Sequence, residues 1–336
     1  MSETLTDTVA NISKQAAKLT QDALVWDNLF PCSDGTRELQ IKLLHRVKSC
    51  GYDFVTFTLG EDSSGIKETI KNIAAARALV LSQPDDFVLV NTADDVTAAK
   101  QAGKLAISFH FQGTGPVESD LGMIEVYYAL GVRQMLLATN LRNMVGDGCK
   151  ERTDSGLSRF GVQVIEEMNR VGMLVDGSHT GNRTTLEACE VSKDPFIFSH
   201  SNPKAIFDHP RNITDEQIKA SAATGGVIGI NGVGVFLGEN DSSTETIIRH
   251  VDYVAELVGA EHVGIATDLP VDAANSSPTP WNPPHPGDVP WSEINYIQPE
   301  QLPELADGLL QRGYKDSDVR GILGENWLDL ARRVWK

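Results

Sequence analysis

The sequence predicts a single α/β domain with the (β/α)8 TIM-barrel fold. Short apolar stretches alternate with helix-like segments along most of the chain, which is typical of parallel strands joined by helices. No block of consecutive strands interrupts this alternation, and a chain of 336 residues has the length of one barrel with insertions. A doubly wound open sheet is the alternative fold, but no GxGxxG motif follows the first strand.

Eight segments are predicted to be strands, because each is short, apolar and rich in β-branched or aromatic residues. In chain order they span residues 23–30, 53–59, 105–112, 133–140, 173–179, 196–200, 226–232 and 262–268. Helix-like segments accompany them at residues 36–50, 65–82, 119–130, 158–171, 181–191, 214–223 and 243–258. Residues 1–336 are therefore expected to form one domain, with residues 1–22 as an N-terminal extension and an amphipathic helix after Gly324.

A long loop follows the last predicted strand. Residues 269–298 are rich in Pro, Ser and Asn and contain Trp281 and Trp291. Because a loop in this position starts at the carboxyl rim of the barrel, it is expected to be a lid or an interface with another subunit. A plain surface loop is the alternative interpretation.

The composition restricts the partners and the compartment. A formal net charge of −17, from 29 basic and 46 acidic residues, argues against nucleic acid or an anionic membrane surface as a partner. No signal-peptide pattern opens the chain, and no run of about 18 apolar residues occurs. The four cysteines form no CxxC pair, so neither a zinc ribbon nor a redox motif is expected. These features predict a soluble cytoplasmic enzyme, and they leave room for a small anionic substrate.

Two histidines and one aspartate end three of the predicted strands. His179 ends "MLVDGSH", His200 ends "FIFSH" and Asp268 ends "HVGIATD". The carboxyl ends of parallel strands meet at one rim of a barrel, where active sites are built. Imidazole and carboxylate groups are the usual protein ligands of zinc. The pattern therefore predicts a metal-dependent hydrolase site at this rim.

Other polar residues are expected near the same rim. Side-chain alternation along residues 105–112 places His110 and Gln112 on the face that lines the barrel interior. His110 is interpreted as a ligand or a catalytic acid or base, with a hydrogen-bonded core histidine as the alternative. Arg211 and Arg142 each follow a strand and are candidates to bind a substrate carboxylate, with surface ion pairs as the alternative.

Several stretches together resemble the membrane dipeptidase (renal dipeptidase, M19) branch of the amidohydrolase superfamily. The most specific are "EEMNRVGMLVDGSHTGNRTTLEA", "FIFSHSNP", "HPRNITDEQIKA", "GGVIGING", "HVGIATD", "GDGCKERTDSGLSRFG" and "GENWLDLARRVW". The resemblance implies an amidohydrolase-like barrel in which His179 and His200 bind zinc. It also implies that Asp268 acts as ligand and proton acceptor, and that Arg211 holds the substrate carboxylate.

The chain departs from the family pattern at the other metal position. Leu29 and Pro31 stand where the family has a His-x-Asp pair, and Gln112 replaces a glutamate that bridges two metals. Asn140 replaces a histidine assigned to oxyanion stabilisation. We therefore expect one zinc ion per chain, held by His179, His200 and Gln112, with Asp268, water or substrate completing the shell. The expected catalytic groups are Asp268, His110 and Asn140, and the expected substrate contacts are Arg211, Arg142, Trp26 and Asn28.

A single metal with open positions favours a substrate that brings its own chelating oxygens. Some bacterial members that this chain resembles hydrolyse a carbon–carbon bond in a meta-cleavage product of aromatic catabolism, and this reaction is the first expectation. A dipeptidase or amidase acting on a small dipeptide-like substrate is the alternative. A catalytically inactive binding protein is the third possibility. A homo-oligomer is a possible assembly, since many barrels associate through their helices.

Overall fold

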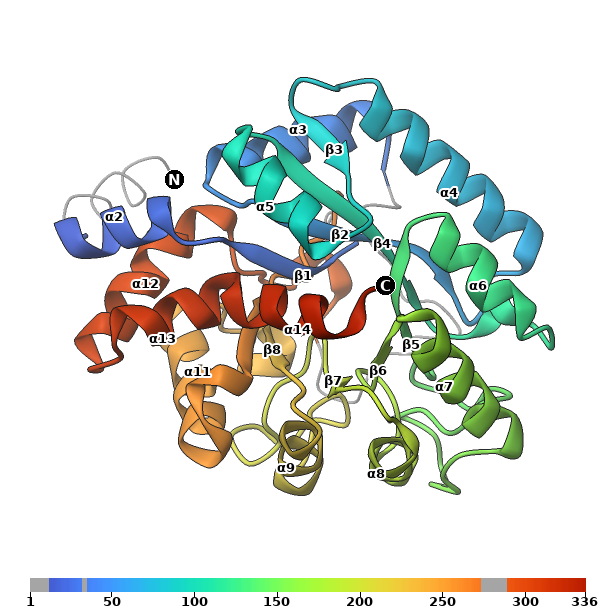
Figure 1. Ribbon diagram of the computed structural model, residues 1–336. Coiled ribbons are helices and arrows are strands. Elements are labelled where there is room, and N and C mark those ends of the chain that lie inside the picture. The colour runs from blue at the N-terminus through green and yellow to red at the C-terminus, as the bar shows by residue number, and fades with distance from the viewer. Residues whose placement is uncertain (1–11, 32–34, 273–288) are drawn as a thin grey trace.

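The computed structural model describes residues 12–31, 35–272 and 289–336, and these form a parallel barrel surrounded by helices (Figure 1). The strands are hydrogen-bonded in the order β7-β6-β5-β4-β2-β1-β9-β8, and a parallel bridge from Phe198 to Ile228 connects the two ends of this series. The barrel strands are β1 (Trp26–Phe30), β2 (Phe54–Glu61), β4 (Leu105–Gln112), β5 (Val132–Leu136), β6 (Leu174–Asp176), β7 (Phe196–Ile197), β8 (Ile228–Asn231) and β9 (Val263–Ala266). The predicted (β/α)8 fold is confirmed.

Helices enclose the barrel because the outward faces of the strands are apolar and must be covered. The helices are α2 (Lys14–Asp22), α3 (Arg37–Ser49), α4 (Ile66–Leu81), α5 (Ala93–Gln101), α6 (Gly122–Ala129), α7 (Arg159–Val171), α8 (Asn182–Val191), α9 (Asp215–Ala223), α10 (Gly234–Leu237), α11 (Thr244–Val258), α12 (Leu302–Gln311), α13 (Asp316–Arg320) and α14 (Asn326–Val334). Short 3-10 turns and the π-helical η7 (Gly321–Glu325) complete the described elements. The principal core lies between this ring of helices and the strands.

An apolar cluster seals the amino end of the barrel. The side chains of Trp26 and Phe54, near the starts of β1 and β2, stack with ring centroids 3.7 Å apart. Helix α14 crosses this end and packs on β1 and β9 (Figure 1). Gly264 in β9 permits that approach, because a Cβ atom there would lie 2.1 Å from Nε1 of Trp327. The opposite, carboxyl end is the one left for polar side chains.

Several elements were not expected from the sequence, among them α2, α10, α12 and α13. Strand β3 (Phe87–Leu89) pairs only with β4 and lies outside the barrel series, and helix α5 follows it. Within the N-terminal extension, the described residues form α2, which packs against α12, and Ser13 N–H donates to the Asp307 carboxylate. The extension is thus part of the folded barrel domain from residue 12 onward.

Only the two ends of the expected lid lie within the described residues, since residues 273–288 are outside them. The returning end is attached to the loop after β8, where Tyr296 pairs with Val233 in an antiparallel bridge. Ile297 N–H also donates to the carbonyl of Gly232, and the Ile297 side chain is buried. Trp281 lies outside the described part of the chain, and Trp291 is half-buried in a 3-10 turn.

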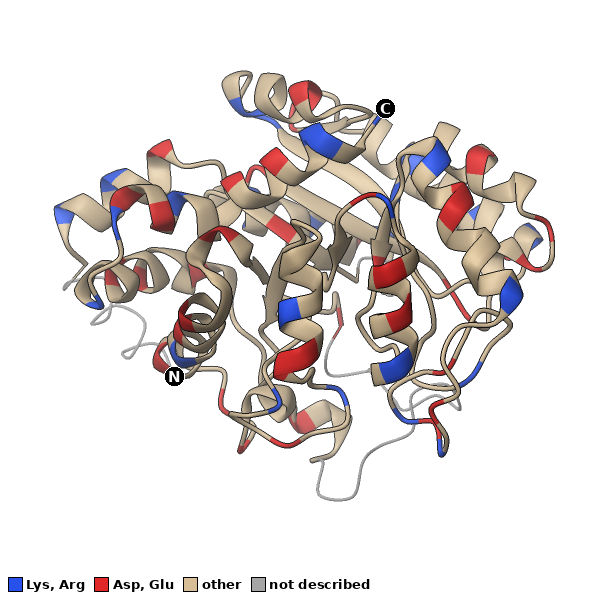
Figure 2. Ribbon diagram, turned by 60° about the horizontal axis from the view of Figure 1, so that its bottom comes forward, with Lys and Arg blue, Asp and Glu red and all other residues tan. Residues whose placement is uncertain are grey.

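Charged residues are found mainly on the outer helices and loops, with both signs interspersed (Figure 2). Across the described ranges, no helix has both the length and the apolar character required to cross a bilayer.

Candidate active site

Two imidazole rings meet at the carboxyl rim of the barrel. His179 follows β6 and His200 follows β7, and their Nε2 atoms are 3.0 Å apart. The backbone of His179 is left-handed, with φ of 63°, as are those of Asn140 (63°) and Asp268 (51°). Left-handed conformations are unfavourable for residues other than glycine, and such strain gathers at functional sites. Three expected site residues therefore share an unusual backbone geometry.

The hydrogen bonds of the outer ring nitrogens determine what the Nε2 atoms can do. Nδ1 of His179 lies 2.8 Å from the Oδ1 atom of Asn140, which only accepts, so this nitrogen carries the proton. Nδ1 of His200 lies 2.6 Å from the Ser199 hydroxyl, which in turn donates to Ser178. With its proton given to Ser178, the Ser199 hydroxyl can accept from Nδ1 of His200. Both Nε2 atoms then present lone pairs to each other.

Two facing lone pairs repel each other unless they share a cation, so the pair fits a metal ion. Burial lowers the pKa of both imidazoles well below their usual value, and the nearby Arg211 guanidinium lowers both further. Neutral imidazole is the form that binds zinc, and an Nδ1–H bonded to an oxygen acceptor is its usual support. Among the described residues, no group of three or more His, Cys, Asp or Glu side chains is placed to hold a metal. The two imidazole donors, with open positions around them, fit a metal ion.

Asp268 follows β9 on the same rim. Its Oδ2 atom accepts a hydrogen bond from Nδ2 of Asn231 at 3.0 Å. Burial raises the pKa of Asp268 to about 6, although the Arg211 guanidinium and the Asn231 bond oppose this shift. At neutral pH the carboxylate form predominates and can accept a proton. Sequence reasoning missed Asn231, although its position at the end of "GVIGIN" on a predicted strand is the same signal that identified the histidines.

Arg211 is buried beside the imidazole pair. Its Nη2 donates to the carbonyl of His200 at 2.7 Å and its Nη1 to the Ser201 hydroxyl at 3.3 Å. The third nitrogen, Nε, is buried and has no hydrogen-bond partner among the described residues. Arg211 and His179 both line a cavity of about 380 Å³. A buried guanidinium with an unused donor is suited to bind an anionic group of a ligand.

His110 and Gln112 belong to a chain of hydrogen bonds inside the barrel. Nε2 of Gln112 donates to the Thr58 hydroxyl at 3.2 Å, and that hydroxyl lies 2.8 Å from Nε2 of His110. Nδ1 of His110 lies 3.3 Å from the Thr56 hydroxyl. Burial lowers the pKa of His110 to about 3, so the ring is neutral. The structure places this histidine below the rim with both ring nitrogens engaged by threonines.

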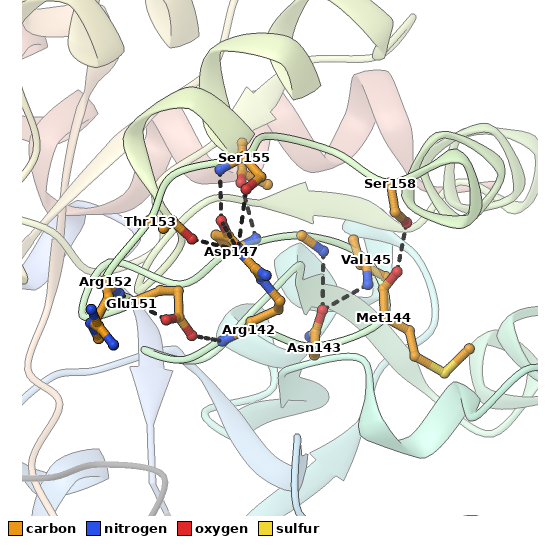
Figure 3. A network of polar contacts seen from close by, with 12 residues as sticks. Arg142, Asn143, Met144, Val145, Asp147, Glu151, Arg152, Thr153, Ser155 and Ser158 are labelled. Carbon is orange, nitrogen blue, oxygen red and sulfur yellow. Dashed lines mark hydrogen bonds and ion pairs between the residues drawn. The ribbon is translucent and has the colours of Figure 1, made fainter.

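The remaining expected site residues lie in different surroundings. Arg142 is engaged in a two-pronged ion pair with Asp147 in the loop after β5 (Figure 3). Trp26 belongs to the amino-end cluster, and its Nε1 donates to Oδ1 of Asn28, which is also buried. The structure therefore brings Asn140 into contact with His179 but does not bring Trp26 to the rim.

Comparisons with known proteins match most of the chain to one family. The sequence model of the membrane dipeptidases, peptidase family M19, matches residues 15–336. An uncharacterized dipeptidase of Schizosaccharomyces pombe is 32% identical over 280 residues, which cover 81% of this chain but 62% of that relative. Dipeptidase verJ of Clonostachys rogersoniana is 29% identical over 280 residues, covering 83% of this chain and 68% of the relative.

Solved structures share the fold. An amidohydrolase from Pseudomonas aeruginosa superposes with a TM-score of 0.85 at 31% identity, covering 95% of this chain and 99% of that one. A metallopeptidase from Rhodobacter sphaeroides, solved with a phosphinate mimic of the dipeptide L-Ala-D-Ala, gives 0.75 at 20% identity, covering 94% and 100%. The family and the two sequence relatives are named as dipeptidases, and none of these names refers to carbon–carbon bond hydrolysis.

Proposed function

Since the chain belongs to the membrane dipeptidase family, peptidase family M19, we propose that it is a metal-dependent hydrolase that cleaves the amide bond of small dipeptide-like substrates. The observation that carries the proposal is the pair of imidazole Nε2 atoms 3.0 Å apart, on the same rim as Asp268 and beside Arg211. The family implies a metal, and the facing lone pairs of His179 and His200 are where we place one zinc ion.

Each residue of the site has a separate task in this proposal. His179 and His200 would hold the ion, which when bound polarises a carbonyl and lowers the pKa of a water molecule. Asp268, oriented by Asn231, accepts the proton of the attacking water and returns it to the leaving amine. Arg211, which lines the cavity, binds the substrate carboxylate.

The cavity supports a small, charged substrate. Its volume is about 380 Å³, and its lining includes the cationic Lys204 and Arg211 and the acidic Glu151 and Asp154. A site with both signs of charge suits a molecule that carries both an ammonium and a carboxylate group, as a dipeptide does. An extended polypeptide would not fit into this volume.

Carbon–carbon bond hydrolysis of a ring-fission product is the second candidate. The observation that favours it is the chemistry at the first strand, where Leu29 is fully buried in place of a polar ligand. Gln112, rather than a carboxylate, ends β4. A site with a single metal can use a substrate whose own oxygens chelate the ion, as those of an α-keto acid do.

The test compares these substrates on one zinc-loaded preparation. A panel of L,L- and L,D-dipeptides and a yellow dienoate ring-fission product are assayed with the wild type, Asp268→Asn and Arg211→Lys. We expect dipeptide turnover, a loss in kcat of about 10²–10⁴-fold in Asp268→Asn, and a KM about tenfold higher in Arg211→Lys.

The other outcomes separate the alternatives. Turnover of the dienoate with no turnover of dipeptides would replace the first candidate by the second. Zinc binding without turnover of either substrate class would indicate the inactive binding protein. Dipeptide turnover that Asp268→Asn leaves unchanged would contradict the assigned proton acceptor.

A further inference from the structure

The loop after β5 is attached to the backbone of His179. The backbone N–H groups of Asn140 and Cys149 both donate to the His179 carbonyl, at 3.2 and 2.8 Å. Gly148 pairs with Thr180 in an antiparallel bridge. These contacts surround a histidine whose φ is +63°, so residues 140–155 hold an unfavourable conformation in place.

One guanidinium group ties this loop together (Figure 3). Nε and Nη2 of Arg142 donate hydrogen bonds to the two carboxylate oxygens of Asp147, the second at 2.9 Å. The same Nη2 donates to the hydroxyls of Thr153 at 2.6 Å and Ser155 at 3.2 Å. The N–H of Ser155 donates to Asp147 at 2.6 Å. Four positions of the loop therefore meet at one ion pair.

The inner partner of this pair is almost inaccessible to water. The Asp147 side chain is 2% exposed, whereas that of Arg142 is 49% exposed. Hydrogen bonding to Arg142 keeps the pKa of Asp147 below its usual value. The Asp147 carbonyl also accepts from Gly181 N–H at 2.7 Å, and its own N–H donates to Thr184. Asp147 thus connects the ion pair to the chain that follows His179 and to the start of α8.

The same loop forms one wall of the cavity beside His179. Its contribution to the lining consists of Gly148, Cys149, Glu151, Thr153 and Asp154. Arg142 is absent from that lining, and its Nε and Nη2 atoms are used by protein acceptors. Arg211 differs from Arg142 in two respects, because it lines the cavity and its Nε has no hydrogen-bond partner among the described residues.

We propose that Arg142 is a positioning residue. Its ion pair with Asp147 holds residues 140–155 against His179, and this fixes both the backbone of that histidine and one wall of the substrate cavity. This differs from the sequence-based expectation that Arg142 binds a substrate carboxylate. The role of the cavity rests on the proposed function, but the restraint on His179 does not depend on it.

Amide hydrogen exchange on the metal-free protein tests the restraint directly. The variants are Arg142→Ala, Arg142→Lys and the control Arg170→Ala, which removes exposed ion pairs with Glu125 and Glu167 on α6 and α7. In Arg142→Ala we expect peptides containing Asn140, Cys149 and Gly181 to exchange at least about tenfold faster. Arg142→Lys, which retains the charge but not the two-pronged grip, gives an intermediate rate. The control retains wild-type exchange.

Zinc affinity and steady-state kinetics provide the second readout. Measured by competition with a chromophoric chelator, zinc affinity falls by about 10–100-fold in Arg142→Ala and stays unchanged in Arg170→Ala. If Arg142 contacts substrate instead, KM rises while exchange and zinc affinity remain those of the wild type. That result would overturn the proposal.

The test of Arg142 still gives a result if one variant fails to fold or if the proposed function is wrong. If Arg142→Ala does not fold, Arg142→Lys and Asp147→Asn carry the same comparison, and wild-type exchange in both would also overturn the proposal. If no dipeptide is turned over, the proposed function fails, while the exchange and zinc-affinity measurements on the same proteins still decide the role of Arg142.

Discussion

At the scale of single residues, Asp27 in β1 is a fully buried carboxyl group held by neutral donors. Its Oδ1 atom accepts the N–H groups of Leu29 and Thr267, at 3.2 and 2.9 Å, and its Oδ2 atom faces the Thr267 hydroxyl. Burial raises the pKa of Asp27 from 3.8 to about 7, and the charge of Asp268 adds to the shift. The folded state therefore binds a proton at this site more tightly than the unfolded chain does.

Asp27→Asn is expected to change the pH dependence of stability. Because the folded pKa is raised, the contribution of Asp27 to stability is fully present below pH 3.8 and is lost as the pH rises through about 7. An amide can accept both N–H groups through Oδ1 and donate to the Thr267 hydroxyl. The variant should therefore gain up to a few kcal/mol relative to the wild type between pH 5 and pH 8 in urea unfolding. Identical pH profiles for the two proteins would contradict this account.

His110 gives a second prediction at this scale. Replacing it by Leu removes the ring that contacts the hydroxyls of Thr56 and Thr58. We expect a loss of about 1–3 kcal/mol in the free energy of unfolding, with zinc content unchanged and kcat reduced less than about tenfold. Urea titration, metal analysis and steady-state kinetics measure these quantities. If His110 is instead the proton shuttle that its sequence position suggested, kcat falls by about 10²-fold or more.

The approach of His179 to His200 could be predicted because it follows from strand ends alone, and so could the place of Asp268 after β9 on the same rim. The contact from Asn140 to His179 could not, since it depends on how a loop folds back rather than on a periodic pattern. Trp26 shows a second difficulty. Its inward orientation follows from alternation, but its depth in the barrel depends on the register with Phe54, which strand periodicity does not specify.

At the scale of elements, α7 begins where the loop around Arg142 ends. The Ser158 hydroxyl caps the helix by accepting the Gly161 N–H at 2.9 Å, and it donates to the Met144 carbonyl at 2.6 Å (Figure 3). One side chain therefore joins the helix start to the loop. The sequence signalled the helix but not its bond to Met144.

Ser158→Ala is expected to destabilise the protein by about 1–2 kcal/mol and to accelerate amide exchange in residues 140–155. The matched control is Ser243→Ala, which removes the cap of α11, where Ser243 accepts the Thr246 N–H at 3.4 Å. Thermal unfolding and hydrogen exchange compare the two. If both variants leave the loop equally protected, Ser158 caps the helix without restraining the loop.

Barrel strands were predicted more readily than the elements outside the barrel. Each of the eight barrel strands lies within or overlaps a predicted apolar stretch. Strand β3, in contrast, has three residues and pairs along one edge only. Helix α5 carries Asp94 and Asp95 in its first turn and a capping box at Thr92, which is a local signal. That signal lies in a polar stretch, where the pattern of apolar residues did not indicate a helix.

At the scale of the whole molecule, the two ends of the barrel have different tasks. The amino end is closed by the cluster around Trp327, whereas the carboxyl end gathers imidazole, guanidinium and carboxylate groups beside a cavity. This division is typical of TIM-barrel enzymes, in which stability and chemistry use opposite ends. It leaves two facing imidazoles that a bound cation would stabilise.

Metal removal is therefore expected to lower the melting temperature. Dialysis against a chelator should reduce Tm by several degrees, and zinc should restore it in a concentration-dependent manner, because a ligand that binds only the folded state stabilises it. His179→Ala should show no such response. If zinc raises the Tm of that variant as much as that of the wild type, the ion binds elsewhere.

The central claim is that one metal ion is held between His179 and His200. Plasma mass spectrometry of protein purified without added metal measures it most directly, with His179→Ala and Arg170→Ala as parallel samples. We expect about one zinc per chain in the wild type and in Arg170→Ala, and none in His179→Ala. Two metals per chain, none in the wild type, or one that survives in His179→Ala would contradict it.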